Sequence, residues 1–329
     1  MKQLDPAGLD SLSALVDEGS FERAARRLAI TQSAISQRLR ALEIEVGQPL
    51  VVRARPLRLT EAGQILLRYA RQLQALRGDA LRELGERSRI ETRVPIAVNA
   101  DSLASWVLPA LQPVIDEGAV LELVADDQDF THDWLREGRV LGCVSTVSEP
   151  LRGCRTTPLC VMSYVAVASP AFVAARLPGG LHRGNFMHQP YVAFNRKDDI
   201  QLQWVARAFG VPEPRLRQHH VPSAEAYVRA VRDGWGIGVA AWVLVRELIE
   251  RGELVWLHPD IRVEVALHWH QWKLASTAGS ERGDVGMAAA PAAGLLDRIA
   301  QALISGAASP AQFGPARLVA YPAADSTPQ

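Results

Sequence analysis

The chain has 329 residues, of which 48% are hydrophobic and 22% charged, so it can form two or three globular domains with ample cores. Its formal net charge is zero, but residues 1–90 carry 15 basic against 11 acidic side chains, whereas the remainder carries 21 against 25. This basic head on an acidic body is mild evidence for a nucleic-acid partner.

Apolar patterning and cysteine usage exclude other classes of protein. No apolar run approaches the length of a membrane span, and the N-terminus lacks the apolar core of a signal peptide. The three cysteines have no CxxC spacing and are expected to be reduced thiols rather than a disulfide framework. We therefore expect a cytoplasmic protein with no membrane partner.

Residues 1–60 predict three short helices followed by a hairpin. The first helix ends at Gly19, the second begins after the cap residue Ser20, and the third begins after Thr31. A proline and short β-prone runs in residues 49–59 are typical of a small hairpin or wing.

A long helix is expected to open at Thr60 with Glu61, and a polar hinge is expected at 85–93. The apolar side chains of this helix recur at heptad spacing, which favours pairing with a second copy of the chain. The members of this heptad seam are Leu66, Tyr69, Leu73, Leu76 and Ala80.

From Val94 onward, short β-rich runs alternate with helix-like stretches, which predicts parallel α/β units. The expected strands are 95–99, 120–125, 140–145, 164–168, 191–195 and 263–269, and the expected helices start near Ser102, Pro170, Ser223 and Ala241. Residues 276–291 are expected to form an exposed loop, and 306–329 a disordered tail.

The third helix carries the clearest functional pattern. One face is apolar, and the opposite face presents Gln32, Ser33, Ser36, Gln37 and Arg40. Two helices joined by a tight connection, the second exposing such side chains, are typical of a helix-turn-helix whose second helix enters the major groove. Gln suits adenine, Ser tolerates several bases, and Arg suits guanine or phosphate. The alternative is a solvated polar face with no partner.

Several segments resemble the DNA-binding region of LysR-type transcriptional regulators. They are SFERAARRL at 20–28, TQSAISQR at 31–38, VGQPL at 46–50, Arg53, and LTEAG at 59–63. The segment VNADSLASWVLPAL at 98–111 resembles the branch of that family that contains ArgP (IciA) and LysG. The resemblance covers about residues 4–275 and resumes near 295–303.

The resemblance implies an α+β multidomain fold. A winged helix-turn-helix (1–60) and a linker and dimerisation helix (61–90) precede a periplasmic-binding-protein-like effector domain (91–305). That domain has two α/β lobes, lobe I at about 91–164 and 268–305 and lobe II at about 165–267. The resemblance also implies a homodimer through the linker helix, a homotetramer on double-stranded DNA, contact with RNA polymerase, and no cofactor besides a small co-effector.

Family members of this branch respond to lysine or arginine and activate genes such as that of an amino-acid exporter. Carried onto this chain, the base-reading candidates are Gln32, Ser33, Ser36 and Gln37. The candidates for phosphate or minor-groove contacts are Ser20, Thr31, Arg38, Arg53 and Arg58, with Arg40 suited to either role.

Effector-binding residues are expected where predicted strands end and helices begin, because ligands of α/β lobes bind at the carboxyl ends of strands. A cationic ligand also needs a carboxylate partner. The candidates are Asp101, Ser102, Asp126, Asp127, Ser145, Phe194, Asn195, Ser223 and Glu225. Asp101 and Ser223 could equally be helix caps, and Asp127 a solvated carboxylate.

Other classes of protein find less support. The chain contains no GxSxG, HExxH, P-loop or GxGxxG motif, so we do not expect an enzyme. His268-x-His270 could be half of a metal site, but ordinary packing is the better interpretation, and no metal is expected. The alternatives kept open are a nucleoid-type or replication-associated DNA-binding protein without effector control, and a solute-binding protein.

Overall fold

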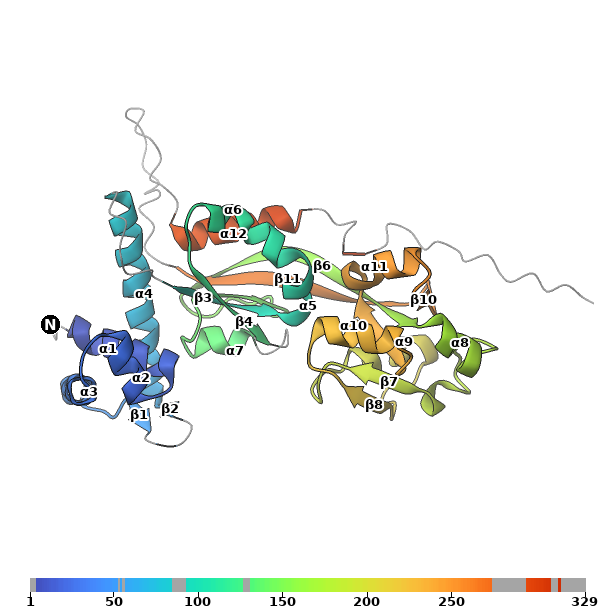
Figure 1. The fold of residues 1–329 in the computed structure, drawn as a ribbon, viewed down its shortest axis with the longest axis horizontal. Coiled ribbons are helices and arrows are strands. Elements are labelled where there is room, and N and C mark those ends of the chain that lie inside the picture. The colour runs from blue at the N-terminus through green and yellow to red at the C-terminus, as the bar shows by residue number, and fades with distance from the viewer. Residues whose placement is uncertain are drawn as a thin grey trace, which may run out of the picture.

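The computed structural model describes residues 4–52, 54, 57–84, 93–126, 131–273, 294–308 and 313–314. A small helical head lies at one end, the long helix α4 stands beside it, and a two-lobed α/β domain extends away from α4 (Figure 1). The predicted loop at 276–291 and most of the predicted hinge and tail lie outside the described residues.

The head forms from three capped helices, α1 (Pro6–Glu18), α2 (Phe21–Arg27) and α3 (Gln32–Val46). The Ser20 hydroxyl accepts a hydrogen bond from the Arg23 N–H, and the Thr31 hydroxyl accepts one from the Ala34 N–H, so each satisfies a donor of a first turn. The turn between α2 and α3 places Ala29 in the left-handed region, at φ 52°. The predicted helix boundaries in the head are therefore set by short-range chemistry.

The wing consists of β1 (Val51–Val52) and β2 (Arg58–Leu59), paired antiparallel. Helix α4 (Glu61–Glu83) starts directly after it. A Cβ at Gly63 would come within 2.1 Å of the Leu50 carbonyl oxygen, so the first turn of α4 can pack on the wing only with glycine there.

The predicted heptad seam divides between two environments. Leu66 is buried in the core of the head, whereas Tyr69 and Leu73 are exposed together with Ile65. Residues spaced four apart lie on one face of a helix, so Ile65, Tyr69 and Leu73 form an exposed apolar stripe on α4.

A single mixed sheet of nine strands carries the effector domain, in the order β4-β3-β5-β11-β6-β9-β7-β8, with β10 paired to β6. The strands are β3 (Val94–Asn99), β4 (Leu121–Asp126), β5 (Gly142–Ser145), β6 (Cys154–Ala168), β7 (Pro190–Ala193), β8 (Arg217–His220), β9 (Ile237–Ala241), β10 (Val255–Trp256) and β11 (Arg262–Trp272).

The sheet is parallel within each end and antiparallel in the middle. Strand β3 runs parallel to β4 and β5, and β7 runs parallel to β8 and β9. The long strands β6 and β11 pair antiparallel from Arg262↔Val165 to Trp272↔Cys154 and pass from one lobe into the other (Figure 1). The expectation of parallel α/β units is confirmed at both ends of the sheet but is wrong for these two strands, because they return through the middle of the molecule.

Helices cover the sheet in both lobes. Lobe I contains β3 to β5 with α5 (Ala100–Ser102), α6 (Leu108–Asp116), α7 (Thr131–Arg136) and α12 (Leu295–Gly306). Lobe II contains β7 to β10 with α8 (Pro170–Arg176), the 3₁₀ turn Phe186–His188, α9 (Ile200–Phe209), α10 (Ala224–Arg232) and α11 (Trp242–Glu250). In Figure 1, α6 and α12 lie together on one face of lobe I, and α7 lies on the other. The predicted lobe boundaries fall inside β6 and close to β11's β-bulge at Leu267/His268, and remain a prediction.

Helix α5 continues into α6 through a π-helical turn, Leu103–Val107. Pro109 lacks the N–H that would bind the Ser105 carbonyl in a regular α-helix, which accounts for a wider turn immediately before it. The helix therefore runs from Ala100 to Asp116 with an irregularity one turn from its start.

Arginines of α4 join the head to lobe I. The buried Arg71 forms an ion pair with Asp17 of α1 at 2.5 Å and donates to the Gly138 carbonyl, after α7, at 3.0 Å. Arg68 donates to the Arg136 carbonyl at 2.6 Å. Both carbonyls belong to the C-terminal end of α7, where the partial negative charge of a helix favours cations.

One part of the predicted tail differs from expectation. Phe313 is 1% exposed and packs in the core of the effector domain. Composition alone suggested a disordered segment there, but a single aromatic side chain can dock on a core built by distant residues.

Candidate functional site

The exposed face of α3 presents the predicted base-reading side chains. Gln32, Ser33 and Gln37 are exposed and Ser36 is partly buried, while Ile35, Leu39 and Leu42 of the same helix pack into the head. Arg40 is also exposed. A polar face on a helix whose opposite face is fixed in a core can enter a major groove without rearrangement.

The predicted backbone-contacting residues surround that face. Ser20 and Thr31 serve as helix caps, and the Thr31 hydroxyl also lies 2.9 Å from the Ser33 hydroxyl. Arg38 is partly buried, and Arg58 is exposed on the wing strand β2. Arg53 lies outside the described residues.

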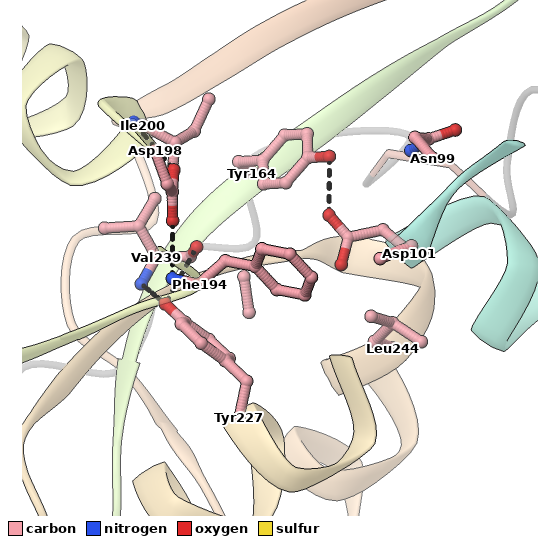
Figure 2. A pocket seen from close by; sticks show the side chains of 11 residues that line it. Asn99, Asp101, Tyr164, Phe194, Asp198, Ile200, Tyr227, Val239 and Leu244 are labelled. Atoms are coloured by element: carbon pink, nitrogen blue, oxygen red, sulfur yellow. Dashed lines mark hydrogen bonds between the residues drawn. The ribbon is translucent and has the colours of Figure 1, made fainter. Parts of the chain in front are cut away.

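A small pocket that opens to solvent lies between the two lobes. Its walls come from the end of β3, the start of α5, strand β6, and elements of lobe II. The lining residues are Asn99, Ala100, Asp101, Tyr164, Phe194, Asp198, Ile200, Tyr227, Val239, Ala240 and Leu244. Figure 2 shows most of these side chains gathered around one space.

Two carboxylates line this pocket, and each is held by donors from the protein. The Tyr164 hydroxyl donates to Asp101 at 2.8 Å (Figure 2), which joins β6 to α5. Asp198 accepts hydrogen bonds from the Phe194 N–H at 2.8 Å and the Ile200 N–H at 3.2 Å. These hydrogen bonds fix the orientation of both carboxylates at the pocket wall.

Tyr227 forms the floor of the pocket on the side of lobe II. Its hydroxyl accepts from the Val239 N–H at 2.8 Å and donates to the Val239 carbonyl at 3.1 Å. Burial raises the pKa of Tyr227 far above its usual value, and the charge of Asp198 adds to this effect. The phenol is therefore neutral at any physiological pH.

Two helix N-termini reach the pocket without side-chain caps. Asn99 precedes α5 and Ala241 precedes α11, and neither makes a side-chain cap hydrogen bond. The first turns of these helices therefore offer backbone N–H groups to an anionic ligand. Asn99 is 2% exposed, and its Oδ1 has no hydrogen-bond partner among the described residues. An orphaned buried acceptor at a pocket wall is suited to receive a donor from a ligand.

Of the predicted effector residues, Asp101 and Phe194 line this pocket. The Ser102 hydroxyl instead donates to the sulfur of Met162, inside the core. The Ser145 hydroxyl accepts from the Val147 N–H, and Asn195 accepts from the N–H groups of its own turn.

The remaining predicted effector residues lie elsewhere or are not described. Ser223 caps α10 through the Ala226 N–H, and Glu225 is exposed on that helix. Asp126 ends β4 beside Asn99 in the parallel ladder. Asp127 lies outside the described residues.

The pocket also contains residues that sequence reasoning missed, above all Asp198, Tyr164 and Tyr227. Asp198 follows β7 by a short turn, so the rule that ligands bind beyond strand ends could have found it. Tyr164 lies within the long strand β6, and Tyr227 in the middle of α10, where no local signal marks a ligand contact.

In the His268-x-His270 motif, hydrogen bonds account for His270, whereas the Nδ1 of His268 is buried and has no hydrogen-bond partner among the described residues. The His270 Nε2 lies 2.7 Å from the Val147 carbonyl oxygen, and its Nδ1 lies 3.0 Å from the Thr156 hydroxyl, so both ring nitrogens are engaged. The part of the chain that the structure describes holds no group of three or more His, Cys, Asp or Glu side chains able to bind a metal ion. Nor is any of its helices both long and apolar enough to span a membrane.

A winged helix-turn-helix joined by a long helix to a two-lobed pocket defines a class, the ligand-responsive DNA-binding regulators. Residues 7–64 match the bacterial regulatory helix-turn-helix proteins of the lysR family, and residues 87–279 match the LysR substrate binding domain. The chain belongs to the LysR family of transcriptional regulators.

Individual relatives place it near ArgP and LysG. The regulator ArgP of Aeromonas salmonicida is 41% identical over 276 residues, covering 83% of this chain and 92% of that protein. The crystal structure of ArgP from Mycobacterium tuberculosis matches with a TM-score of 0.75 at 38% identity, over 93% of this chain and 98% of that one. Full-length LysG from Corynebacterium glutamicum, solved with bound effector Arg, matches with a TM-score of 0.66 at 33% identity, over 92% and 98%.

These matches confirm the predicted family and fold class. The helix-turn-helix gives the chain its DNA-binding function, and family membership makes it a regulator of transcription rather than an enzyme. The solute-binding interpretation is wrong, because the head is itself a member of a DNA-binding family.

Proposed function

We propose that this LysR-family regulator responds to lysine or arginine bound in the pocket between its lobes. The observation that carries the proposal is the charge of the pocket. Asp101 and Asp198 both line it, and its described lining includes no lysine or arginine. Two carboxylates on the wall of one partly desolvated site favour a cationic ligand.

The pocket offers complementary groups for each end of a basic amino acid. The carboxylate of the bound amino acid can lie at the uncapped N-termini of α5 and α11, where backbone N–H groups and the helix dipole favour an anion. Its ammonium or guanidinium group can donate to Asp101 and Asp198, and the Oδ1 of Asn99 can accept another hydrogen bond. The bound effector Arg of the similar LysG supports this ligand class.

On DNA, Gln32, Ser33, Ser36 and Gln37 are proposed to read bases. Ser20, Thr31, Arg38, Arg53 and Arg58 are proposed to contact the backbone or minor groove, and Arg40 is suited to either role. The exposed stripe of Ile65, Tyr69 and Leu73 on α4 supports a dimer through that helix. The family suggests three further parts of the proposal. They are pairs of such dimers on DNA, contact with RNA polymerase, and activation of an amino-acid exporter gene.

Calorimetry on the full chain with lysine, arginine and leucine tests the effector. We expect binding of lysine or arginine and none of leucine, and a loss of roughly 10- to 100-fold in affinity for Asp101→Asn or Asp198→Asn, the range for a hydrogen bond to a charged group. Glu225→Gln removes an exposed carboxylate outside the pocket and is the matched control. Equal affinity for all three amino acids would refute selection by charge.

Sequence-specific DNA binding is tested separately by gel shifts on the upstream region of the protein's own gene at two salt concentrations. We expect site-specific binding that weakens as salt rises. Indifference to sequence would support a nucleoid-type role instead.

A further inference from the structure

Phe313 contacts two elements that lie far apart in the sequence. Its ring meets that of Trp106 edge to face, with centroids 5.7 Å apart and an interplanar angle of 85°. Its carbonyl oxygen accepts a hydrogen bond from the Ser163 N–H at 2.8 Å. The side chain is 1% exposed and the next residue, Gly314, packs on the Ser163 side chain. Phe313 thus touches the π-helical turn Leu103–Val107 and strand β6 at once.

The hydrogen-bonded pair Asp101 and Tyr164 of the pocket lies next to both contacts. Asp101 lies on α5, two residues before the π-helical turn begins, and its carbonyl accepts a hydrogen bond from the Ser105 hydroxyl of that turn at 2.6 Å. Tyr164 follows Ser163 on β6 and donates to the Asp101 carboxylate. Successive residues of a strand face opposite sides of a sheet. The Ser163 side chain therefore faces the side of the sheet opposite to Tyr164. A contact at Ser163 can hold strand β6 in place without entering the pocket.

The π-helical turn makes this support important for Asp101. A π turn is less regular than an α-helix, and the first turn of α5 has no side-chain cap to fix it. Trp106, 4% exposed, is the large side chain that anchors this turn, and Phe313 packs on its ring. The position of Asp101 relative to Tyr164 thus depends on packing at the far side of the turn.

We propose that Phe313 is a positioning residue of the effector pocket. By docking on Trp106 and binding Ser163, it holds the Asp101–Tyr164 pair in the geometry that receives a cationic effector. This role rests on the proposed function of the pocket. Phe313 lies beyond residue 279, where the match to the LysR substrate binding domain ends.

Calorimetry with lysine and arginine on the full-length Phe313→Ala variant tests the role. We expect affinity to fall by about tenfold, within the range found for coupled sites. Phe172→Ala is the matched control, because Phe172 is 5% exposed and packs in the same core but lies on α8, away from the pocket lining. Its affinity should change by less than about twofold. Equal losses in the two variants would overturn the proposal, since any cavity in the core would then have the same effect.

A double-mutant cycle distinguishes positioning from general destabilisation. Tyr164→Phe removes the hydroxyl that binds Asp101, so Phe313→Ala should have little further effect on affinity in that background. Full additivity would overturn the proposal. If Phe313→Ala does not fold, Phe313→Leu, which keeps most of the buried volume, takes its place with a smaller expected loss.

Amide hydrogen exchange without ligand separates this proposal from the effector assignment. We expect faster exchange at residues 100–107 in Phe313→Ala than in wild type and in Phe172→Ala. Wild type that binds neither lysine nor arginine, combined with this faster exchange, would refute the proposed effector but leave the positioning of Asp101 supported. Unchanged exchange there and unchanged affinity would refute the role of Phe313 alone.

Discussion

The head and the effector pocket obtain their geometry in opposite ways. The proposed base-reading side chains lie within one helix, α3, whose start is fixed by the Thr31 cap and whose apolar face is buried in the head. The pocket instead combines residues that are far apart in the sequence, from Asn99 to Leu244, on elements of two lobes. The reading face thus moves as one rigid unit, whereas the pocket changes shape whenever the lobes move. The ligand site therefore lies where a bound molecule can alter the structure.

The largest expected effect concerns the buried Arg71, which contacts both the head and the effector domain. Arg71→Ala should lower the free energy of unfolding by about 3 kcal/mol, the lower end for breaking a buried ion pair, because Asp17 keeps Arg27 as a partner. Arg77→Ala, an exposed change on the same helix, should cost little. Urea unfolding measures both. Equal, small changes in the two variants would mean that the contacts of Arg71 contribute nothing to the free energy of unfolding.

Lowering the pH should reduce the stability of the effector domain more than that of the head. Burial lowers the pKa of His270 to about 4 from its usual 6.5. The stability that neutral His270 allows is complete above pH 6.5 and is lost as pH falls towards 4, because the unfolded chain takes up a proton that the folded domain does not. The loss approaches about 3 kcal/mol near pH 4.

His270→Gln should flatten the pH dependence of effector-domain stability, followed by unfolding at a series of pH values, and leave the exchange of head amides unchanged. The same steep decline in the variant would assign acid sensitivity to other groups.

Within the head, some side chains should determine which DNA sequence is bound, and others should contribute equally to binding of every DNA sequence. Gln37→Ala should cost about 1–3 kcal/mol at one base position and relax the preference there. Arg58→Ala should weaken binding to all sequences alike and reduce the salt slope by about one. Binding selections over a randomised operator, repeated at two salt concentrations, measure both. A uniform loss for both variants would show that α3 is not the reading helix.

The smallest expected effect concerns strain in the helix-turn-helix. Ala29 occupies the left-handed region, which costs a residue with a Cβ about 1–2 kcal/mol. Ala29→Gly should raise the unfolding free energy by about 0.5–1 kcal/mol after the entropy of glycine is included. Ala41→Gly on the exposed face of α3 is the control and should destabilise by about 1 kcal/mol. Lower stability for both variants would contradict the strain at Ala29.

The head was predictable because its signals are local. The caps at Ser20 and Thr31 and the apolar spacing of Ile35, Leu39 and Leu42 are each readable within one or two turns of helix. The pattern also predicted ligand contacts beyond strand ends in the effector domain, and Asp101 and Phe194 do line the pocket.

The rest of the pocket depends on contacts that sequence spacing does not encode. Tyr164 and Asp101 are neighbours only because β6 returns through the middle of the sheet as an antiparallel strand. The hydroxyls of Ser145 and Ser223 accept hydrogen bonds from backbone N–H groups two and three residues away, so local chemistry engages them before any ligand arrives. The hydroxyl of Ser102 donates to the sulfur of Met162, a contact that only the fold creates.

The continuous pairing of β6 with β11 limits how the lobes can move. A connection made of loops would let the lobes swing by rotation about a few backbone dihedrals. Two extended segments paired from Arg262↔Val165 to Trp272↔Cys154 resist such rotation, because a swing must twist the ladder or extend its irregularity at Leu267/His268. The two lobes therefore share a continuous two-stranded connection, and any change in their relative orientation must deform the paired strands.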